Sequence, residues 1–188
     1  MVGSIPLTTK YSISEKEEEV CNNLSIKNTP MEKYKELFPS TEDYYRYIEQ
    51  LEKKISTFAT SYMSNAKWRK LFTAIIAHKN LIKQCEIYDF FGYCVNEIAW
   101  HKVGNDSDLY IQEDYISENI TTGEYPTYYR EIEYIEFKAR WQKTYIGKLV
   151  PPIYETQELN AIETLLHSIG QFQLLKTEDS LRVLGYGN

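Results

Sequence analysis

Residues 130–141 read Arg-Glu-Ile-Glu-Tyr-Ile-Glu-Phe-Lys-Ala-Arg-Trp, and charged residues alternate in this run with β-branched and aromatic ones. Alternation of this kind sends successive side chains to opposite faces of a strand, so that one face is apolar. The apolar phase shifts by one position between Ile132 and Ile135. An extra residue in a β-bulge accommodates such a shift. We therefore predict a bulged strand in a mainly antiparallel sheet.

Other segments before this run are also rich in β-branched and aromatic residues. They are predicted to be strands at residues 82–91, 95–103 and 109–116. The sheet region accordingly spans residues 81–150, and Pro151-Pro152 ends it.

Helical periodicity dominates residues 29–80. Thr29-Pro30-Met31-Glu32 has the composition of a helix start, and we predict a short helix to Phe38. After Pro39, apolar residues at alternating spacings of four and three predict one long helix, with a stripe formed by Tyr44, Ile48, Leu51, Ile55, Phe58 and Tyr62. A third helix is predicted from Ser64-Asn65, its cap, to about Asn80.

The C-terminal residues predict a helix and then a hairpin. The helix has an apolar face from Leu159 to Ile169 and ends at Gly170, for which we expect the left-handed conformation. Residues 171–176 and 181–186 are predicted to pair around a four-residue turn.

The predicted fold class is α+β: N-terminal helices, a mainly antiparallel sheet, one C-terminal helix and a final β-hairpin. At 188 residues the chain fits one domain better than two. Residues 1–28, polar and charged, are expected to form a flexible N-terminal arm. Residues 29–188 are expected to form a single domain, divided into a helical part (29–80), the sheet (81–150) and the helix plus hairpin (151–188).

The chain carries 21 Lys and Arg against 27 Asp and Glu, a formal net charge of -6. A surface of this sign repels phosphate backbones, which argues against direct nucleic-acid binding. A basic protein partner suits it, because complementary charge steers association. The charge is equally consistent with a domain that is merely kept soluble.

Three features of the sequence indicate the cellular compartment of the protein. We see no secretory signal at the N-terminus and no apolar run long enough for a membrane helix. The three cysteines, Cys21, Cys85 and Cys94, are odd in number and lack the spacing of a disulfide framework. We therefore expect a cytoplasmic protein.

Metal sites are not expected. His78, Cys85, Cys94 and His101 are the most metal-like set, but nearly a full strand separates each residue from the next, and zinc sites use short spacings. Residues 106–108, Asp-Ser-Asp, begin like a calcium loop but lack its later glycine and glutamate. No cofactor is predicted either, because no phosphate-binding loop or dinucleotide motif occurs.

Glu131 and Glu133 are the strongest catalytic candidates. On a regular strand they would share one face, and paired carboxylates can divide acid and base roles. No His, Cys or Ser forms a recognised motif beside them, and solvent-facing strands often carry such glutamates. We predict that the chain is not an enzyme.

A partner-binding surface is indicated where acidic residues interleave with tyrosines. Tyrosine rings supply contact area, and carboxylates pair with basic groups of a partner. The same pattern is typical of a solvated, tyrosine-rich sheet edge. The predicted partner-binding residues are Asp106, Asp108, Tyr110, Glu113, Asp114, Tyr115, Glu118, Glu124, Tyr125, Tyr128 and Tyr129.

Residues 62–72, 128–136 and 182–186, in this order, resemble an uncharacterised family of small bacterial proteins. That family is similar to immunity proteins of polymorphic or contact-dependent toxin systems. The resemblance covers about residues 60–188, and Tyr134 stands where the family carries Trp. It implies a toxin inhibitor and no catalytic residue.

The leading hypothesis is a protein that binds and neutralises a protein partner, such as a basic toxin domain. One alternative is a small-ligand binder or an enzyme with a scattered carboxylate site that uses Glu131, Glu133 or His101. Another is an oligomerising structural module, in which the helical stripe from Tyr44 to Tyr62 packs against a second copy. The oligomeric state stays open.

Overall fold

The computed structural model describes residue 35 and residues 38–91, 95–98, 110–117, 121, 126–143 and 151–188. The chain divides into two compact units, Met1–Pro39 and Ser40–Asn188. The second unit contains every helix and strand named below. The predicted arm (1–28) lies outside the described residues, and so does nearly all of the predicted helix at 29–38.

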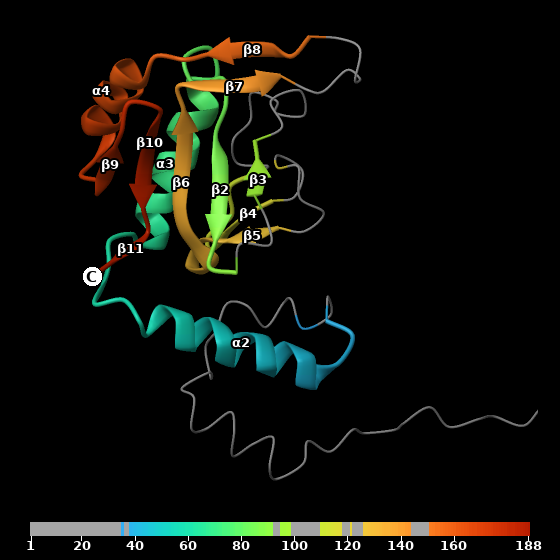
Figure 1. The fold of residues 1–188 in the computed structure, drawn as a ribbon. Coiled ribbons are helices and arrows are strands. Elements are labelled where there is room, and N and C mark those ends of the chain that lie inside the picture. Colours follow the sequence, from blue (N-terminus) through green and yellow to red (C-terminus); the bar gives the residue numbers. More distant parts are fainter. Residues whose placement is uncertain are drawn as a thin grey trace, which may run out of the picture. The chain divides into compact units, whose positions relative to one another are not determined.

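The second unit has the predicted α+β fold (Figure 1). The α-helices among its described residues are α2 (Thr41–Ile55), α3 (Asn65–Ala77) and α4 (Leu159–Ile169). The strands of the largest sheet are β2 (Glu86–Asp89), β3 (Val95–Glu97), β6 (Ile132–Lys138), β9 (Leu174–Lys176) and β10 (Ser180–Leu184). Within the described residues, no helix is long and apolar enough to cross a membrane.

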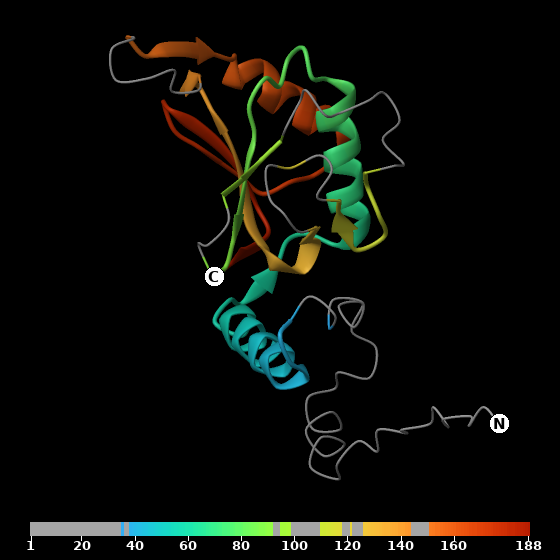
Figure 2. The same cartoon turned by 90° about the vertical axis from the view of Figure 1, so that its right-hand side faces the viewer.

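The strand order of the largest sheet is β3-β2-β6-β10-β9, and every neighbouring pair is antiparallel. One face of this sheet is apolar and almost completely buried. It is formed by Ile87, Ile135, Phe137, Leu181 and Val183. Figure 2, a view along the sheet, shows α3 against one side of it. The apolar sides of α3 and α4 pack there, so the core lies between the helices and the sheet.

Short ladders flank the large sheet. They pair β1 (Thr60–Ser61) with β11 (Tyr186–Gly187), β4 (Tyr115–Ile116) with β5 (Thr127–Tyr128), and β7 (Arg140–Lys143) with β8 (Ile153–Thr156). The first of these joins the segment before α3 to the end of the chain. The last is a ribbon with exposed Ile153 and Tyr154.

The predicted β-bulge is confirmed in β6. Tyr88 of β2 pairs with Tyr134, but the next residue, Asp89, pairs with Ile132. Glu133 is therefore the extra residue on β6. This insertion brings both Ile132 and Ile135 to the buried face, which explains the phase shift in the sequence.

Gly185 packs tightly against the bulged segment. Its N–H donates to the carbonyl of Glu133 (2.8 Å), and its carbonyl accepts from the N–H of Tyr62 (2.8 Å). A Cβ at this position would lie 2.5 Å from the carbonyl oxygen of Ile132. Glycine is therefore required by the close approach of two backbones.

Gln157 connects the segment before α4 to the sheet, and its side chain is almost fully buried. Its Oε1 accepts from the N–H groups of Lys83 (2.9 Å) and Gln84 (3.2 Å). Its Nε2 donates to the carbonyls of Gln84 and Lys138, both at 2.9 Å. One amide thus satisfies four backbone groups, three in the segment before β2 and one at the end of β6.

The prediction of a helix through Tyr62 was wrong, because α2 ends at Ile55. The hydroxyls of Ser56 and Thr57 donate to the carbonyls of Lys53 and Lys54 in the last turn of the helix. The following residues instead form β1 and pair with β11. Tertiary pairing thereby overrides the helical spacing of the apolar residues.

Other boundaries also differ from the predictions. The strand predicted at 109–116 is reduced to Tyr115–Ile116, and the one at 82–91 begins only at Glu86. The run 130–141 is interrupted at Ala139, whose N–H donates to Asp179 instead of a strand partner. Gly170 has φ 176°, which is extended backbone and not the predicted left-handed conformation. The Ser64 cap of α3 and the β9–β10 hairpin are confirmed.

Candidate functional site

The second face of the large sheet is polar and aromatic, and no described helix covers it (Figure 2). Side chains of β2, β6 and β10 meet on it because residues in register across antiparallel strands share a face. We call this group the open face. It consists of Glu86, Tyr88, Tyr134, Glu136, Lys138 and Arg182.

Two stacked rings form the centre of the open face. Tyr88 and Tyr134 pair directly across strands, and their ring centroids are 4.5 Å apart with an interplanar angle of 17°. The guanidinium of Arg182 lies over the Tyr134 ring, 4.7 Å from its centroid. Stacking and a cation–π contact hold the rings and the cation in fixed positions.

Ion pairs hold the charged groups of the open face. Arg182 Nε donates to Glu136 (2.8 Å), and Lys138 Nζ contacts the Glu86 carboxylate (2.6 Å). The hydroxyl of Tyr88 donates to the same carboxylate at 2.6 Å. The two carboxylates and the two cations balance, so the open face carries no net charge of its own.

The pKa shifts agree with this pairing. Burial acts to raise the pKa of Glu136, but the hydrogen bonds from Arg182 and Ser180 outweigh it and the pKa is lowered. The hydrogen bond to Glu136 raises the pKa of Arg182. Burial, together with the neighbouring Glu86, raises the pKa of Tyr88. Its hydroxyl therefore stays a neutral donor at physiological pH.

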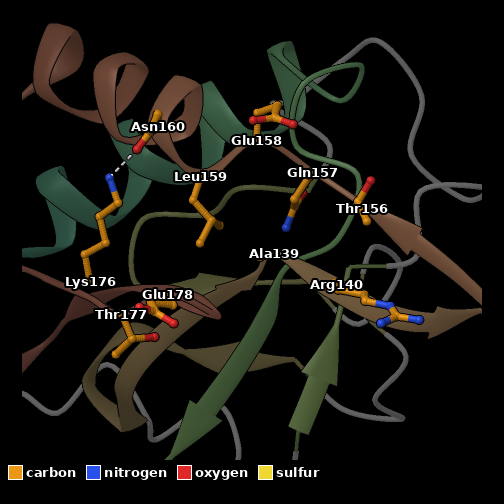
Figure 3. A pocket seen from close by; sticks show the side chains of 10 residues that line it. All are labelled: Ala139, Arg140, Thr156, Gln157, Glu158, Leu159, Asn160, Lys176, Thr177 and Glu178. Carbon is orange, nitrogen blue, oxygen red and sulfur yellow. Dashed lines mark hydrogen bonds between the residues drawn. The ribbon is translucent and has the colours of Figure 1, made fainter.

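A groove of about 890 Å³ lies beside the start of α4 (Figure 3). It is lined by Ala139, Arg140, Thr156, Gln157, Glu158, Leu159, Asn160, Lys176, Thr177 and Glu178. Two of its charged groups have partners: Lys176 donates to Asn160 and Glu163, and Arg140 lies 4.0 Å over the Tyr154 ring. Glu131, Glu133 and the open face do not line it, so the candidate carboxylates do not converge on this groove.

The predicted partner-binding residues are only partly described. Asp106, Asp108, Glu118, Glu124 and Tyr125 lie outside the described residues. Tyr110, Glu113, Asp114 and Tyr115 lie at or near β4, where Tyr115 pairs with Tyr128 of β5. Glu113 is the exposed member of this group. None of these residues belongs to the open face.

Tyr128 and Tyr129 were wrongly predicted to be surface residues. Their exposed fractions are 2% and 1%. The Tyr129 ring stacks on Phe72 of α3 at 5.8 Å, and its hydroxyl donates to the carbonyl of Gln112 (3.0 Å). The Tyr129 ring is therefore part of the core, and its hydroxyl has a hydrogen-bond acceptor there. Their sequence neighbourhood, rich in acid and tyrosine, did not distinguish core rings from surface rings.

Glu131 and Glu133 do not share a strand face. Glu131 lies in the 3-10 turn η4 (Tyr129–Glu131), and Glu133 is the bulge residue of β6. Of the metal candidates, Cys94 and His101 lie outside the described residues, while Cys85 is buried. Among the residues with described positions, no group of three or more His, Cys, Asp or Glu is arranged to hold a metal ion.

None of the six residues of the open face was predicted as a site. The signal in the sequence was the alternation of polar and apolar residues in residues 86–89, 132–138 and 180–184, which predicts one solvent-facing side for each strand. The alternation does not reveal which strands are neighbours. The ion pair between Glu136 and Arg182 joins residues 46 positions apart and depends on β6 pairing with β10.

The part of the chain that contains the open face matches a known protein family. Residues 51–188 match a family of unknown function, DUF6678. No curated protein and no solved structure matches the chain. The match starts inside α2 and includes all six residues of the open face. Because it covers well over half of the sequence, the chain belongs to the DUF6678 family of unknown function.

Proposed function

We propose that this chain is a protein-binding protein whose open face contacts a protein partner. The observation that carries the proposal is the pair of stacked tyrosines with Arg182 over one ring. Tyr and Arg are enriched among the residues that dominate binding energy at protein interfaces. Stacking and ion pairs already order these side chains. Binding of a partner therefore costs little of their conformational entropy.

The shape of the surface favours a macromolecule over a small ligand. The open face is one side of a sheet, whereas small-molecule sites are concave and enclose their ligand. Leu175, in register with Arg182, adds an apolar side chain that is 47% exposed. A sheet face with fixed rings, paired charges and an apolar margin has the composition of an interface core with a polar rim.

Within this class, we propose an inhibitor of a toxin domain, acting as an immunity protein in the bacterial cytoplasm. The resemblance of residues 62–72, 128–136 and 182–186 to such proteins supports this narrower proposal. The net charge of -6 supports a basic partner. The open face is itself neutral, so attraction of a basic partner would come from the rest of the chain. A non-enzymatic role is part of the proposal and is consistent with the separation of Glu131 and Glu133.

The test is binding to toxin domains encoded beside the gene, with matched surface variants. Tyr134→Ala removes the central ring, and Leu175→Asp places a charge beside Arg182. We expect each to weaken binding to the cognate domain at least about 10-fold in calorimetry, since truncated interface anchors cost roughly 2 kcal/mol. Co-expression of the wild-type chain should protect cells from that toxin.

The control is Ile153→Asp on the β7–β8 ribbon, because Ile153 is 49% exposed and so matches Leu175. It should leave binding unchanged. Equal binding by Tyr134→Ala, Leu175→Asp and wild type would exclude the open face as the interface. The absence of both complex formation and protection would exclude the toxin-inhibitor proposal.

A further inference from the structure

Side-chain contacts join helix α2 to the segments around η4 and the end of β2, and Tyr44, Ile48 and Leu51 of α2 are also buried. The hydroxyl of Tyr47 donates to Glu131 Oε1 at 2.6 Å. The Tyr47 ring lies 5.3 Å from the ring of Phe91, and Glu52 forms an ion pair with Arg130. The family match begins at residue 51. Tyr47 is therefore outside the matched region, while its acceptor Glu131 is inside it.

Glu131 links three parts of the fold. One carboxylate oxygen accepts from Tyr47 of α2, and the other accepts from the backbone N–H of Tyr128 at 3.4 Å, which caps η4. Its own carbonyl accepts from the N–H of Phe90, next to the end of β2 (3.2 Å). The carboxylate thus sits where α2, η4 and the β2 end meet.

The surroundings of this carboxylate disfavour its charged form. Burial is the largest cause and raises the pKa of Glu131 from 4.5 to about 7. The hydrogen bonds from Tyr47 and the Tyr128 N–H act in the opposite direction, and Asp89 of β2 raises the pKa further. These are the groups that face Glu131 from α2, β5 with η4, and β2.

We propose that Glu131 is a proton-controlled latch, which holds α2 on the sheet domain when protonated and loosens α2 when it becomes charged. A protonated carboxyl still accepts from Tyr47 and loses no hydration energy of an ion. A charged carboxylate gains hydration when α2 moves away. The equilibrium between attached and detached α2 is therefore coupled to the protonation of one residue.

The direction of the pH dependence follows from how tightly Glu131 binds its proton when α2 is attached and when it is detached. With α2 attached, Glu131 binds its proton more tightly than a solvated glutamate does. The stabilisation of the attached form is complete below the pKa of the solvated group and is lost as the pH rises through about 7. Between pH 5.5 and pH 8.0, we expect attachment of α2 to weaken on the order of 10-fold.

The test is hydrogen exchange of the full chain at pH 5.5 and pH 8.0, expressed as protection factors so that the intrinsic pH dependence cancels. In the wild type, protection of α2 amides should fall about 10-fold relative to α3 amides, which serve as the internal reference. Glu131→Gln keeps a neutral acceptor for Tyr47 and should abolish the change. Tyr47→Phe should lower α2 protection at both pH values.

Tyr45→Phe is the matched control, since it removes a tyrosine hydroxyl from the same helix two positions from Tyr47 and should keep the wild-type pH dependence. Equal relative protection of α2 at both pH values in the wild type would contradict the proposed role of Glu131. The proposal is also contradicted if Glu131→Gln retains the pH-dependent change in protection seen in the wild type. A carboxyl titration of Glu131 by carbon NMR that gives an ordinary glutamate pKa in the folded chain would overturn it independently of exchange.

Discussion

Replacement of Gln157 by Met is expected to lower the free energy of unfolding by about 4 kcal/mol, because it leaves four buried or part-buried backbone groups without their side-chain partner. Met is close to Gln in size, so the change removes hydrogen bonds without opening a large cavity. The amide contacts backbone groups of Lys83, Gln84 and Lys138. Urea denaturation followed by tryptophan fluorescence measures the loss.

Gln142→Met is the control for this experiment. Gln142 is exposed on β7. Its replacement should change the free energy of unfolding by no more than about 0.5 kcal/mol. If the two variants lose similar stability, the hydrogen bonds of Gln157 do not contribute as proposed, and the segment before α4 must be held in another way.

Gly185→Ala should be nearly as damaging, with a loss of about 3 kcal/mol in the free energy of unfolding. The added Cβ would meet the carbonyl oxygen of Ile132 at 2.5 Å and that of Glu133 at 3.0 Å. Backbone atoms cannot move aside as a flexible side chain does, so either β6 or the segment between β10 and β11 must shift. For a domain of this size, we expect the melting temperature to fall by roughly 10 °C.

Gly170→Ala provides the matched glycine control. The nearest atoms to its added Cβ belong to the Phe172 ring, at 3.2 Å, and a side chain can adjust. Its extended backbone is open to any residue. Its effect should stay within about 1 kcal/mol. A loss for Gly170→Ala as large as that for Gly185→Ala would contradict the distinction between backbone and side-chain contacts.

The sequence predicted local structure well where one periodicity acts alone. Helix α3 has a serine cap and a wide apolar face, and the β9–β10 hairpin has a polar turn between two apolar runs. The bulge in β6 was predicted because one inserted residue leaves a visible phase shift at Ile132 and Ile135. In these cases the determining interactions are close in the chain.

Prediction failed where distant segments decide the structure. The spacing of Phe58 and Tyr62 is helical, yet pairing of β1 with β11 removes them from α2. Tyr128 and Tyr129 are amphipathic residues that suit a surface or a core, and the Tyr129 ring is buried in contact with Phe72 of α3. The open face is likewise assembled from strands that are separated in sequence, so its ion pairs could not be predicted.

The strand order has a consequence for how the chain is made. β6 lies in the middle of the sheet, but one of its two neighbours, β10, is synthesised more than forty residues later. Until residues 180–184 have left the ribosome, β6 keeps an unpaired edge, which is a template for association with other chains. β1 likewise waits for β11. The large sheet is therefore completed only after residues 180–184 have been translated, and a translation pause before residue 180 would expose the unpaired edge of β6 to aggregation.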